Sequence, residues 1–192
     1  GSVFKMHFCY IHDGNGGNML KSRAERNEIN YNWLEGSFYR ELELIGPDPL
    51  AQDSNWTEDL VREDSDIVGN VLVHTSTNSV VRAGGDGGGG QTKGRYRFVN
   101  NTFIMNNGST VFQLFDAMES IEMHNNIIYR PAGAATILNV SSVIWSTGNR
   151  LIAGSNNWLQ TGTAMPVEWT GTQLGSGNPG FINLVGYDLR PA

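Results

Sequence analysis

Apolar and polar residues alternate over several short stretches of the chain, and this alternation predicts β-strands rather than helices. It is clearest over residues 39–44 and 120–123. Successive side chains of a strand point to opposite faces, so alternation gives each strand one apolar and one polar face. Glycines and asparagines interrupt every stretch of roughly ten residues that could form an amphipathic helix. We therefore expect an all-β protein.

One short pattern recurs in a fixed register: an apolar residue, two residues, an asparagine, one residue, and a second apolar residue. The copies are Ile29–Asn32–Leu34, Ile67–Asn70–Leu72, Phe98–Asn101–Phe103 and Met123–Asn126–Ile128, with a degenerate fifth copy at Ser146–Asn149–Leu151. Successive asparagines are 38, 31, 25 and 23 residues apart. Similarity at such a period is typical of stacked-repeat proteins. Leucine-rich repeats are the main alternative, but most copies lack their dense leucine spacing.

The repeat and the alternation together favour a right-handed parallel β-helix of about six coils, each of roughly 22 to 25 residues. An asparagine at a bend of such a coil tolerates left-handed backbone and bonds its own turn. Asparagines stacked from coil to coil can also bond to one another as a ladder. We expect the two apolar positions of the repeat to form two interior columns. The asparagines are then structural rather than catalytic.

The chain of 192 residues is long enough for one domain with a substantial core. We expect a single β-helix domain over residues 1–192, with a weaker repeat after about residue 152 and a closing segment at 171–192. The longer steps of the repeat predict loop insertions near 47–64 and 84–94. The second insertion is glycine-rich, but it lacks the Gly-Lys-Ser/Thr order of a phosphate-binding loop.

Composition excludes several classes of function. The formal net charge of −6 argues against a general affinity for nucleic acid or for anionic membranes. No apolar run approaches the roughly 20 residues of a membrane-spanning helix. The single cysteine, Cys9, excludes an intrachain disulfide and is compatible with either a reducing or an oxidising compartment. Because Cys9 lies in an alternating stretch, we expect it to be a buried core thiol.

Two repeats and the C-terminal tail carry a family resemblance. The repeats read FVNNTF at 98–103 and MHNNII at 123–128, and the tail reads NPGFIN at 178–183 followed by GYDLR at 186–190. On these motifs nearly the whole chain resembles the right-handed parallel β-helix proteins related to polysaccharide lyases, the pectate lyase-like superfamily. The resemblance implies a carbohydrate-related role and a periplasmic or secreted location, although no signal peptide is visible. The same scaffold also carries hydrolases, epimerases and phage spikes.

Lys21-Ser22 resembles a motif of the chondroitinase B and alginate lyase subgroup. There the lysine removes a proton from the uronate, and two preceding acids hold the Ca²⁺ that offsets the substrate carboxylate. Those two positions are Gly14 and Gly16 here, so both acids are missing. The resemblance leaves Lys21 as the base and Arg23 or Arg26 to neutralise a carboxylate. The run from Gly16 to Ala24 is closer to uncharacterised β-helix proteins with a Lys-Ser-Arg-Ala motif, which implies no activity.

Four charged residues form the first candidate site. Lys21 and Arg23 lie two positions apart on an expected strand and share one face, as Glu41 and Glu43 do on the expected next coil. One interpretation is a charged groove for an acidic or hydroxyl-rich glycan, with Lys21 and Arg23 catalytic and both glutamates binding substrate. The other is a cross-strand charge ladder, which is favoured because surface charges are usually only solvated.

Other candidate contacts are His12 and Trp56. His12 is followed by Asp13, and the two can act as an acid–base pair, but no serine or cysteine motif completes a catalytic triad. Trp56 lies inside the acidic insertion and is the best sugar-stacking candidate among the tryptophans, because a loop tryptophan is less often part of the core.

A column of acids is the only candidate for a metal site. Asp48, Asp86 and Asp116 each follow an expected strand and together could hold Ca²⁺. An aspartate at a strand end more often bonds its own turn, so we expect no metal ligand and no other cofactor.

Three functions therefore remain open. The first is a lyase that acts on a uronic-acid polymer by β-elimination. The second is a module that binds a glycan without turnover. The third is a structural, oligomerising domain: no polar cap precedes the strand expected at residues 3–11, and an uncapped end favours pairing with a second copy.

Overall fold

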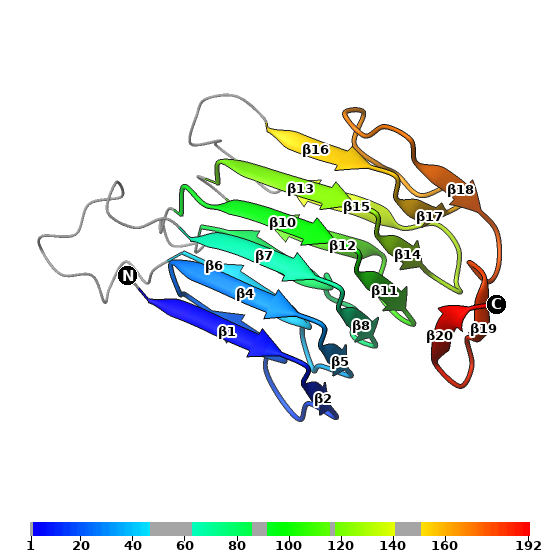
Figure 1. The fold of residues 1–192 in the computed structure, drawn as a ribbon, viewed down its shortest axis with the longest axis horizontal. Coiled ribbons are helices and arrows are strands. Elements are labelled where there is room, and N and C mark those ends of the chain that lie inside the picture. Colours follow the sequence, from blue (N-terminus) through cyan, green and yellow to red (C-terminus); the bar gives the residue numbers. More distant parts are fainter. Residues whose placement is uncertain (1, 47–62, 86–91, 116–117, 141–150) are drawn as a thin grey trace, which may run out of the picture.

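The computed structural model describes residues 2–46, 63–85, 92–115, 118–140 and 151–192. Within these ranges the chain forms β-strands and no helices, which confirms the prediction of an all-β protein. Most strands belong to three parallel sheets whose strands are stacked side by side along the molecule (Figure 1). No helix in the described part of the chain is long and apolar enough to cross a membrane.

The three sheets are named here by their strands in spatial order. Sheet A contains β1 (Val3–His7), β4 (Arg26–Asn30), β7 (Asp64–Val68), β10 (Arg95–Val99), β13 (Ser120–His124) and β16 (Ile152–Ser155). Sheet B contains β2 (Tyr10–His12), β5 (Trp33–Glu35), β8 (Val71–His74), β11 (Thr102–Met105), β14 (Ile127–Tyr129), β17 (Trp158–Gln160) and β18 (Gln173–Gly175). Sheet C contains β3 (Leu20–Ser22), β6 (Leu42–Ile45), β9 (Val81–Gly84), β12 (Thr110–Leu114) and β15 (Thr136–Val140).

From β1 to β15 the chain visits sheets A, B and C in rotation. Strands that are neighbours in one sheet are therefore separated in the sequence by one strand of each other sheet. Parallel neighbours require such crossover connections, because a tight hairpin can join only antiparallel strands. This connectivity is compatible with the parallel β-helix that the repeat predicts.

The apolar positions of the repeat form the two expected interior columns. Strand register places Ile29, Ile67, Phe98 and Met123 in one row of sheet A, and Leu34, Leu72, Phe103 and Ile128 in one row of sheet B. All of these side chains are buried. The prediction of the columns is therefore confirmed for these four repeats. Burying a side chain of this kind stabilises a fold by roughly 1.5–3 kcal/mol, so the columns contribute much of the stability of the fold.

The asparagines form a hydrogen-bonded ladder between these columns. The ladder consists of Asn32, Asn70, Asn101, Asn126 and Asn157. From Asn70 onward, each side-chain oxygen accepts from the backbone N–H and the side-chain amide of the preceding asparagine, at 2.9–3.0 Å. Each side-chain nitrogen also donates to a backbone carbonyl of the preceding repeat. Because all of these amides are buried, the ladder satisfies polar groups that would otherwise destabilise the interior.

The fifth ladder residue is Asn157, so the prediction of Asn149 for this place was wrong. Asn149 lies outside the described residues, whereas Asn126 donates from its backbone N–H to the side-chain oxygen of Asn157 at 2.9 Å. Leu151 was expected in the second interior column but is 43% exposed. Leu159 occupies that column instead, paired with its neighbour in β14.

This fifth repeat is not visible in the pattern of apolar residues, because a glycine stands at its first apolar position. Gly154 stands at the first apolar position, in register with Met123. A Cβ on Gly154 would lie 2.4 Å from Nε1 of Trp169, so the indole fills the space that an apolar side chain fills in the other repeats. A residue fifteen positions away in the sequence thus completes the column, and no local pattern could show this.

The left-handed position of each corner lies one residue before the ladder, and not at the ladder asparagine as expected. The residues directly before the ladder positions have φ of 55–67°, and they are Phe8, Tyr31, Gly69, Asn100, Asn125 and Asn156. Phe8 belongs to a first repeat that the sequence pattern missed, because Cys9 takes the ladder place there and donates its N–H to the side-chain oxygen of Asn32 at 3.0 Å. Cys9 is exposed, so the prediction of a buried core thiol was wrong.

The C-terminal residues cover part of the outer face of sheet B. β19 (Phe181–Asn183) and β20 (Asp188–Pro191) form an antiparallel pair beside this sheet (Figure 1). Phe181 packs with Val73, Ile104 and Tyr129 in a second buried cluster. This cluster lies on the opposite side of sheet B from the interior column, because its residues directly follow the column residues in each strand.

The two predicted loop insertions fall largely outside the described residues, at 47–62 and 86–91. The predicted end of the first insertion was one residue too late, because Asp64 already belongs to β7. The second began one residue early, because Gly84 is still part of β9.

Candidate ligand-binding cleft

The predicted site residues lie on three different faces of the molecule. Lys21 is on β3 in sheet C, Arg26 is on β4 in sheet A, and His12 is on β2 in sheet B. Trp56 lies outside the described residues. The described candidates therefore do not share one groove, and each face has to be considered by itself.

Lys21 belongs to a cross-strand charge network on sheet C. Register places Lys21, Glu43 and Arg82 side by side on β3, β6 and β9. Lys21 Nζ lies 3.3 Å from Glu43 Oε2, and Arg82 Nη1 donates to Glu43 Oε1 at 2.7 Å. Asn18 Nδ2 donates to Glu43 Oε2 at 2.6 Å. Two cations and an amide thus share one buried carboxylate, and Lys21 is engaged in an ion pair instead of facing a substrate alone.

Arg23 does not join this network in the described contacts. Its guanidinium donates to the backbone carbonyl of Gly46, directly after β6. Its positive charge also acts on the carboxyl group of Glu63, where it opposes the dominant effect of burial. Arg23 therefore stabilises a corner of the fold, a role that its position two residues after Lys21 did not reveal.

Glu63 is a buried carboxyl group that the sequence analysis missed. It lies just before β7, and burial raises its pKa from 4.5 to about 9. Burial also raises the pKa of the neighbouring Tyr96 hydroxyl, and the charge of Glu63 adds to this shift. Glu63 is thus a neutral carboxylic acid at pH 7. It lies within the predicted insertion at 47–64, which is rich in acids, so nothing in the local pattern distinguished it.

Glu41 is buried at a corner and does not share an exposed face with Glu43 and Lys21, contrary to expectation. Its Oε2 lies 2.5 Å from His74 Nδ1, and its Oε1 accepts from Ser37 Oγ at 2.8 Å. The side chains of Glu41 and His74 are fully buried. The reason is its position before β6, where the end of β8 packs against it.

Ser37, Glu41 and His74 are the residue types of a catalytic triad in an arrangement that cannot act as one. The hydroxyl of Ser37 bonds the carboxylate, whereas a nucleophilic serine bonds the histidine. His74 Nε2 is 2.8 Å from the carbonyl oxygen of Asn78 and must donate to it, because a carbonyl only accepts. Both ring nitrogens are thus engaged in holding the turn after β8.

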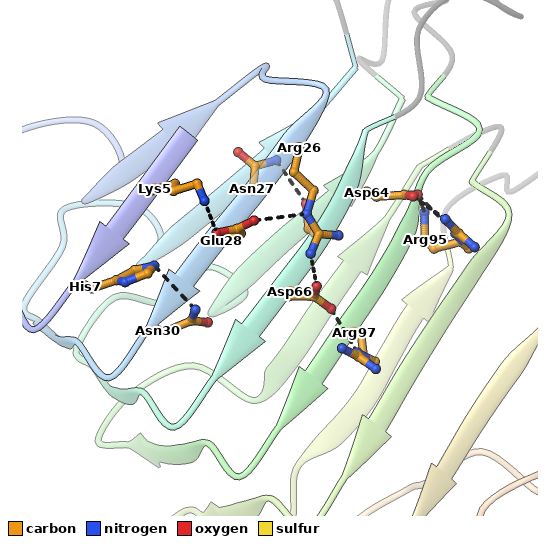
Figure 2. Close-up of polar contacts among 11 residues, drawn as sticks. Lys5, His7, Arg26, Asn27, Glu28, Asn30, Asp64, Asp66, Arg95 and Arg97 are labelled. Atoms are coloured by element: carbon orange, nitrogen blue, oxygen red, sulfur yellow. Dashed lines mark hydrogen bonds and ion pairs between the residues drawn. The ribbon is translucent and has the colours of Figure 1, made fainter. Parts of the chain in front are cut away.

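Arg26 lies on an outer face of sheet A where each cation meets an acid (Figure 2). Asp66 accepts from Arg26 and, at 2.8 Å, from Arg97 Nε. Asp64 accepts from Arg95 Nε at 3.2 Å and from a second nitrogen of the same guanidinium. A groove of about 250 Å³ is lined by Arg26, Asp64, Asp66, Arg95, Arg97 and Glu122. Because the charges in this groove are mutually paired, it offers no excess of positive charge to an acidic polymer.

His12 lies beside an open aromatic cleft on the outer face of sheet B. The cleft has a volume of about 480 Å³ and is lined by Tyr10, Trp33, Glu35, Gly186 and Tyr187. Register pairs Tyr10 with Trp33 and His12 with Glu35 on the adjacent strands β2 and β5. Alternation puts these four side chains outward, and the buried Leu34 of the interior column lies between two of them.

The rings of the cleft stand at steep angles to one another. The ring centroids of Tyr10 and Trp33 are 6.3 Å apart with planes at 89°, and those of Trp33 and Tyr187 are 5.9 Å apart at 73°. Such edge-to-face pairs are the geometry that aromatic rings prefer. Tyr10 remains 63% exposed, so its ring is available to a ligand.

Carboxylates supply the polar groups of the cleft. Trp33 Nε1 donates to Glu35 Oε2 at 2.9 Å. His12 stacks on the Tyr10 ring at 4.5 Å and bonds Asp13 Oδ2 at 2.7 Å. Partial loss of hydration, followed by the negative charges of Glu35 and Asp13, raises the pKa of Tyr10. The cleft is therefore aromatic and negatively charged.

Tyr187 separates this cleft from a second hollow on the same face. That hollow has a volume of about 340 Å³ and is lined by Ile104, Asn106, Tyr129, Pro131, Leu184, Val185 and Tyr187. Asn106 Nδ2 donates to the Tyr187 hydroxyl at 2.9 Å, which ties the C-terminal segment to the end of β11. The two hollows thus follow one another along the line where the C-terminal segment meets sheet B.

No group of three or more His, Cys, Asp or Glu side chains is placed to hold a metal ion among the described residues. Asp48, Asp86 and Asp116 lie outside them, so the expectation that this column holds no calcium stays a prediction. Neither protein-family models, nor curated proteins, nor solved structures include a match to this chain.

Proposed function

We propose that the chain is a right-handed parallel β-helix of the pectate lyase-like kind and that it binds a polysaccharide without cleaving it. Three parallel sheets visited in rotation, two interior apolar columns and a buried asparagine ladder support the β-helix. The resemblance of its repeats and its tail to polysaccharide-lyase relatives supports a carbohydrate ligand.

The arrangement around Lys21 favours binding over β-elimination. The lysine shares Glu43 with Arg82, and no acid stands at Gly14 or Gly16. Proton abstraction next to a uronate needs a free base and a group that offsets the substrate carboxylate. On the described face of sheet C, Lys21 is already paired with Glu43 and is not available as a free base.

The observation that carries the proposal is the cleft of Tyr10, Trp33, Glu35 and Tyr187. Its volume, about 480 Å³, falls in the range typical of ligand sites. Such sites combine aromatic walls with a few polar groups, and here Glu35 supplies hydrogen-bond acceptors. Aromatic rings can pack on the C–H faces of a sugar while the carboxylate accepts from its hydroxyls.

Affinity electrophoresis in gels containing soluble polysaccharides tests the proposal. We expect at least one polymer to retard the wild-type chain and Trp33→Ala to abolish this retardation. Tyr39→Ala, which removes an exposed tyrosine packed on Phe38, is the matched control and should migrate like the wild type. The formation of unsaturated, ultraviolet-absorbing product from a uronic-acid polymer, lost in Lys21→Ala, would instead establish a lyase.

A second candidate is an oligomerising domain, and the edge strands favour it. In the described part of the chain, β1, β2 and β3 each stand at the edge of their sheet. Val3, Phe8 and Tyr10 are exposed there. Exposed edges with apolar side chains favour strand pairing with another copy. Light scattering over a concentration series tests this candidate: a monomer at all concentrations would exclude it.

A further inference from the structure

The side chains that line the aromatic cleft of sheet B favour one class of saccharide over another. We infer that it accepts an uncharged saccharide and excludes uronic acids, so that the acidic polysaccharide expected from the sequence is not the ligand of this site. The inference rests on the proposed glycan-binding function and concerns the charge of the ligand.

Among the described residues, the lining of the cleft contains no cation. Its titratable members are Tyr10, Glu35 and Tyr187, and the neighbouring Asp13 adds a second carboxylate close to Tyr10. His12, the nearest imidazole, is already paired with Asp13. A uronate placed here would meet negative charge without a partner, which is unfavourable wherever water is displaced.

The same groups suit hydroxyls. A carboxylate offers about four lone-pair positions, and Trp33 Nε1 occupies one of those of Glu35. The remaining positions can accept hydrogen bonds from neighbouring hydroxyls of one sugar ring. A hydrogen bond to a charged acceptor contributes more binding free energy than one between neutral groups. The carboxylate therefore favours the binding of a neutral polyol and disfavours the binding of an anion.

The aromatic walls are held in place before a ligand arrives. Trp33 is fixed by its bond to Glu35 and by its edge-to-face contact with Tyr187. Tyr187 is fixed in turn by Asn106. A site whose side chains are already ordered loses less conformational entropy on binding, and rigid aromatic groups are efficient for this purpose.

Titration calorimetry with two sets of soluble polymers tests the inference. The neutral set comprises a β-glucan, a galactomannan and a xylan, and the acidic set comprises polygalacturonate, alginate and chondroitin. We expect wild-type binding to at least one neutral polymer and to none of the acidic ones at moderate salt. Trp33→Ala and Tyr10→Ala should each weaken this binding at least tenfold, whereas Tyr39→Ala should leave it unchanged.

Reversing the charge at Glu35 separates charge from shape. Glu35→Lys should lose neutral binding and gain measurable affinity for an acidic polymer, and Glu35→Gln should weaken neutral binding without that gain. Circular dichroism checks that each variant is folded. Binding of wild type to acidic polymers alone would overturn the inference and leave the proposed function standing. Binding to an alkylammonium probe in place of any polymer would overturn both, because aromatic rings and carboxylates also suit organic cations.

Discussion

The outer faces of sheets A and B start from the same alternating pattern and end in different surfaces. On sheet A many outward positions are charged, and cross-strand partners neutralise them: Lys5 lies 2.8 Å from Glu28, and Asp66 joins Arg26 and Arg97. On sheet B most outward positions are aromatic or aliphatic, with Glu35 and His12 among the exceptions, and the C-terminal segment covers part of this face.

The difference shows what each face can do. A face of paired charges stays hydrated and has little left to offer a ligand, because each pair already satisfies itself. A partly covered apolar face leaves hollows where its cover ends, and one of these hollows exposes aromatic rings beside the carboxylate of Glu35. The outer face of sheet B is therefore the better candidate for a binding surface.

The largest effect is expected from Glu63, the acid beside sheet A that lacks the pairing of its neighbours. Its pKa is about 9 in the fold against 4.5 ordinarily, so between these values the folded chain binds more protons than the unfolded chain. Stability should then fall as pH rises through this window, by about 1.4 kcal/mol per pH unit at most. Glu63→Gln should remove most of this slope.

Urea unfolding at pH 5, 6, 7 and 8 measures the slope for both proteins. Glu122→Gln serves as the control, because Glu122 is an acid on β13 of sheet A whose side chain is 36% exposed. Equal slopes in the wild type and in Glu63→Gln would show that Glu63 is ionised in the folded chain.

The second effect concerns the cover of sheet B. Phe181 is buried against Val73, Ile104 and Tyr129, and its removal should destabilise the fold by about 3 kcal/mol. Ile182→Ala, at an exposed neighbouring position, should cost less than about 0.5 kcal/mol. Denaturant unfolding followed by tryptophan fluorescence measures both, since Trp33 lies under the same segment. If the two variants lost equal stability, the C-terminal segment would not be a packed part of the fold.

The sequence predicted the interior of the molecule better than its surface. The columns and most of the ladder follow from a register that recurs along the chain, and a buried column tolerates few residue types, as Ile67 and Phe98 illustrate. The fifth repeat was misplaced because Gly154 has no side chain and the indole of Trp169 fills the space at its position in the column. A side chain that fills the place of a residue distant in the sequence cannot be recognised from a local pattern.

The candidate site was harder to predict for a related reason. Lys21 and Glu43 were placed on adjacent strands, and the structure pairs them, but the burial of Glu41 depends on His74 in another sheet. His12 was singled out without its neighbours, because the first repeat has Cys9 in place of asparagine. Tyr187 comes from a segment without any repeat register, so only the fold reveals that it completes the cleft.

The smallest effect is expected on the outer face of sheet A. Arg97 donates to Asp66 and its side chain is 52% exposed, so Arg97→Ala should cost about 0.5 kcal/mol or less. Because Asp66 keeps Arg26 as a partner, the carboxylate is not left without a cation. The small loss should shrink further in 1 M salt, where charges are screened beyond about 3 Å.

Double-mutant cycles with Arg26→Ala and Arg97→Ala, at low and high salt, decide whether this face is only a set of weak pairs. Weak pairs that share an acid should couple by a few tenths of a kcal/mol and lose this coupling in salt. A salt-insensitive loss above about 2 kcal/mol for Arg97→Ala would mean that the charges of sheet A are buried and structural. The contrast with sheet B would then no longer be one between a hydrated face and a packed one.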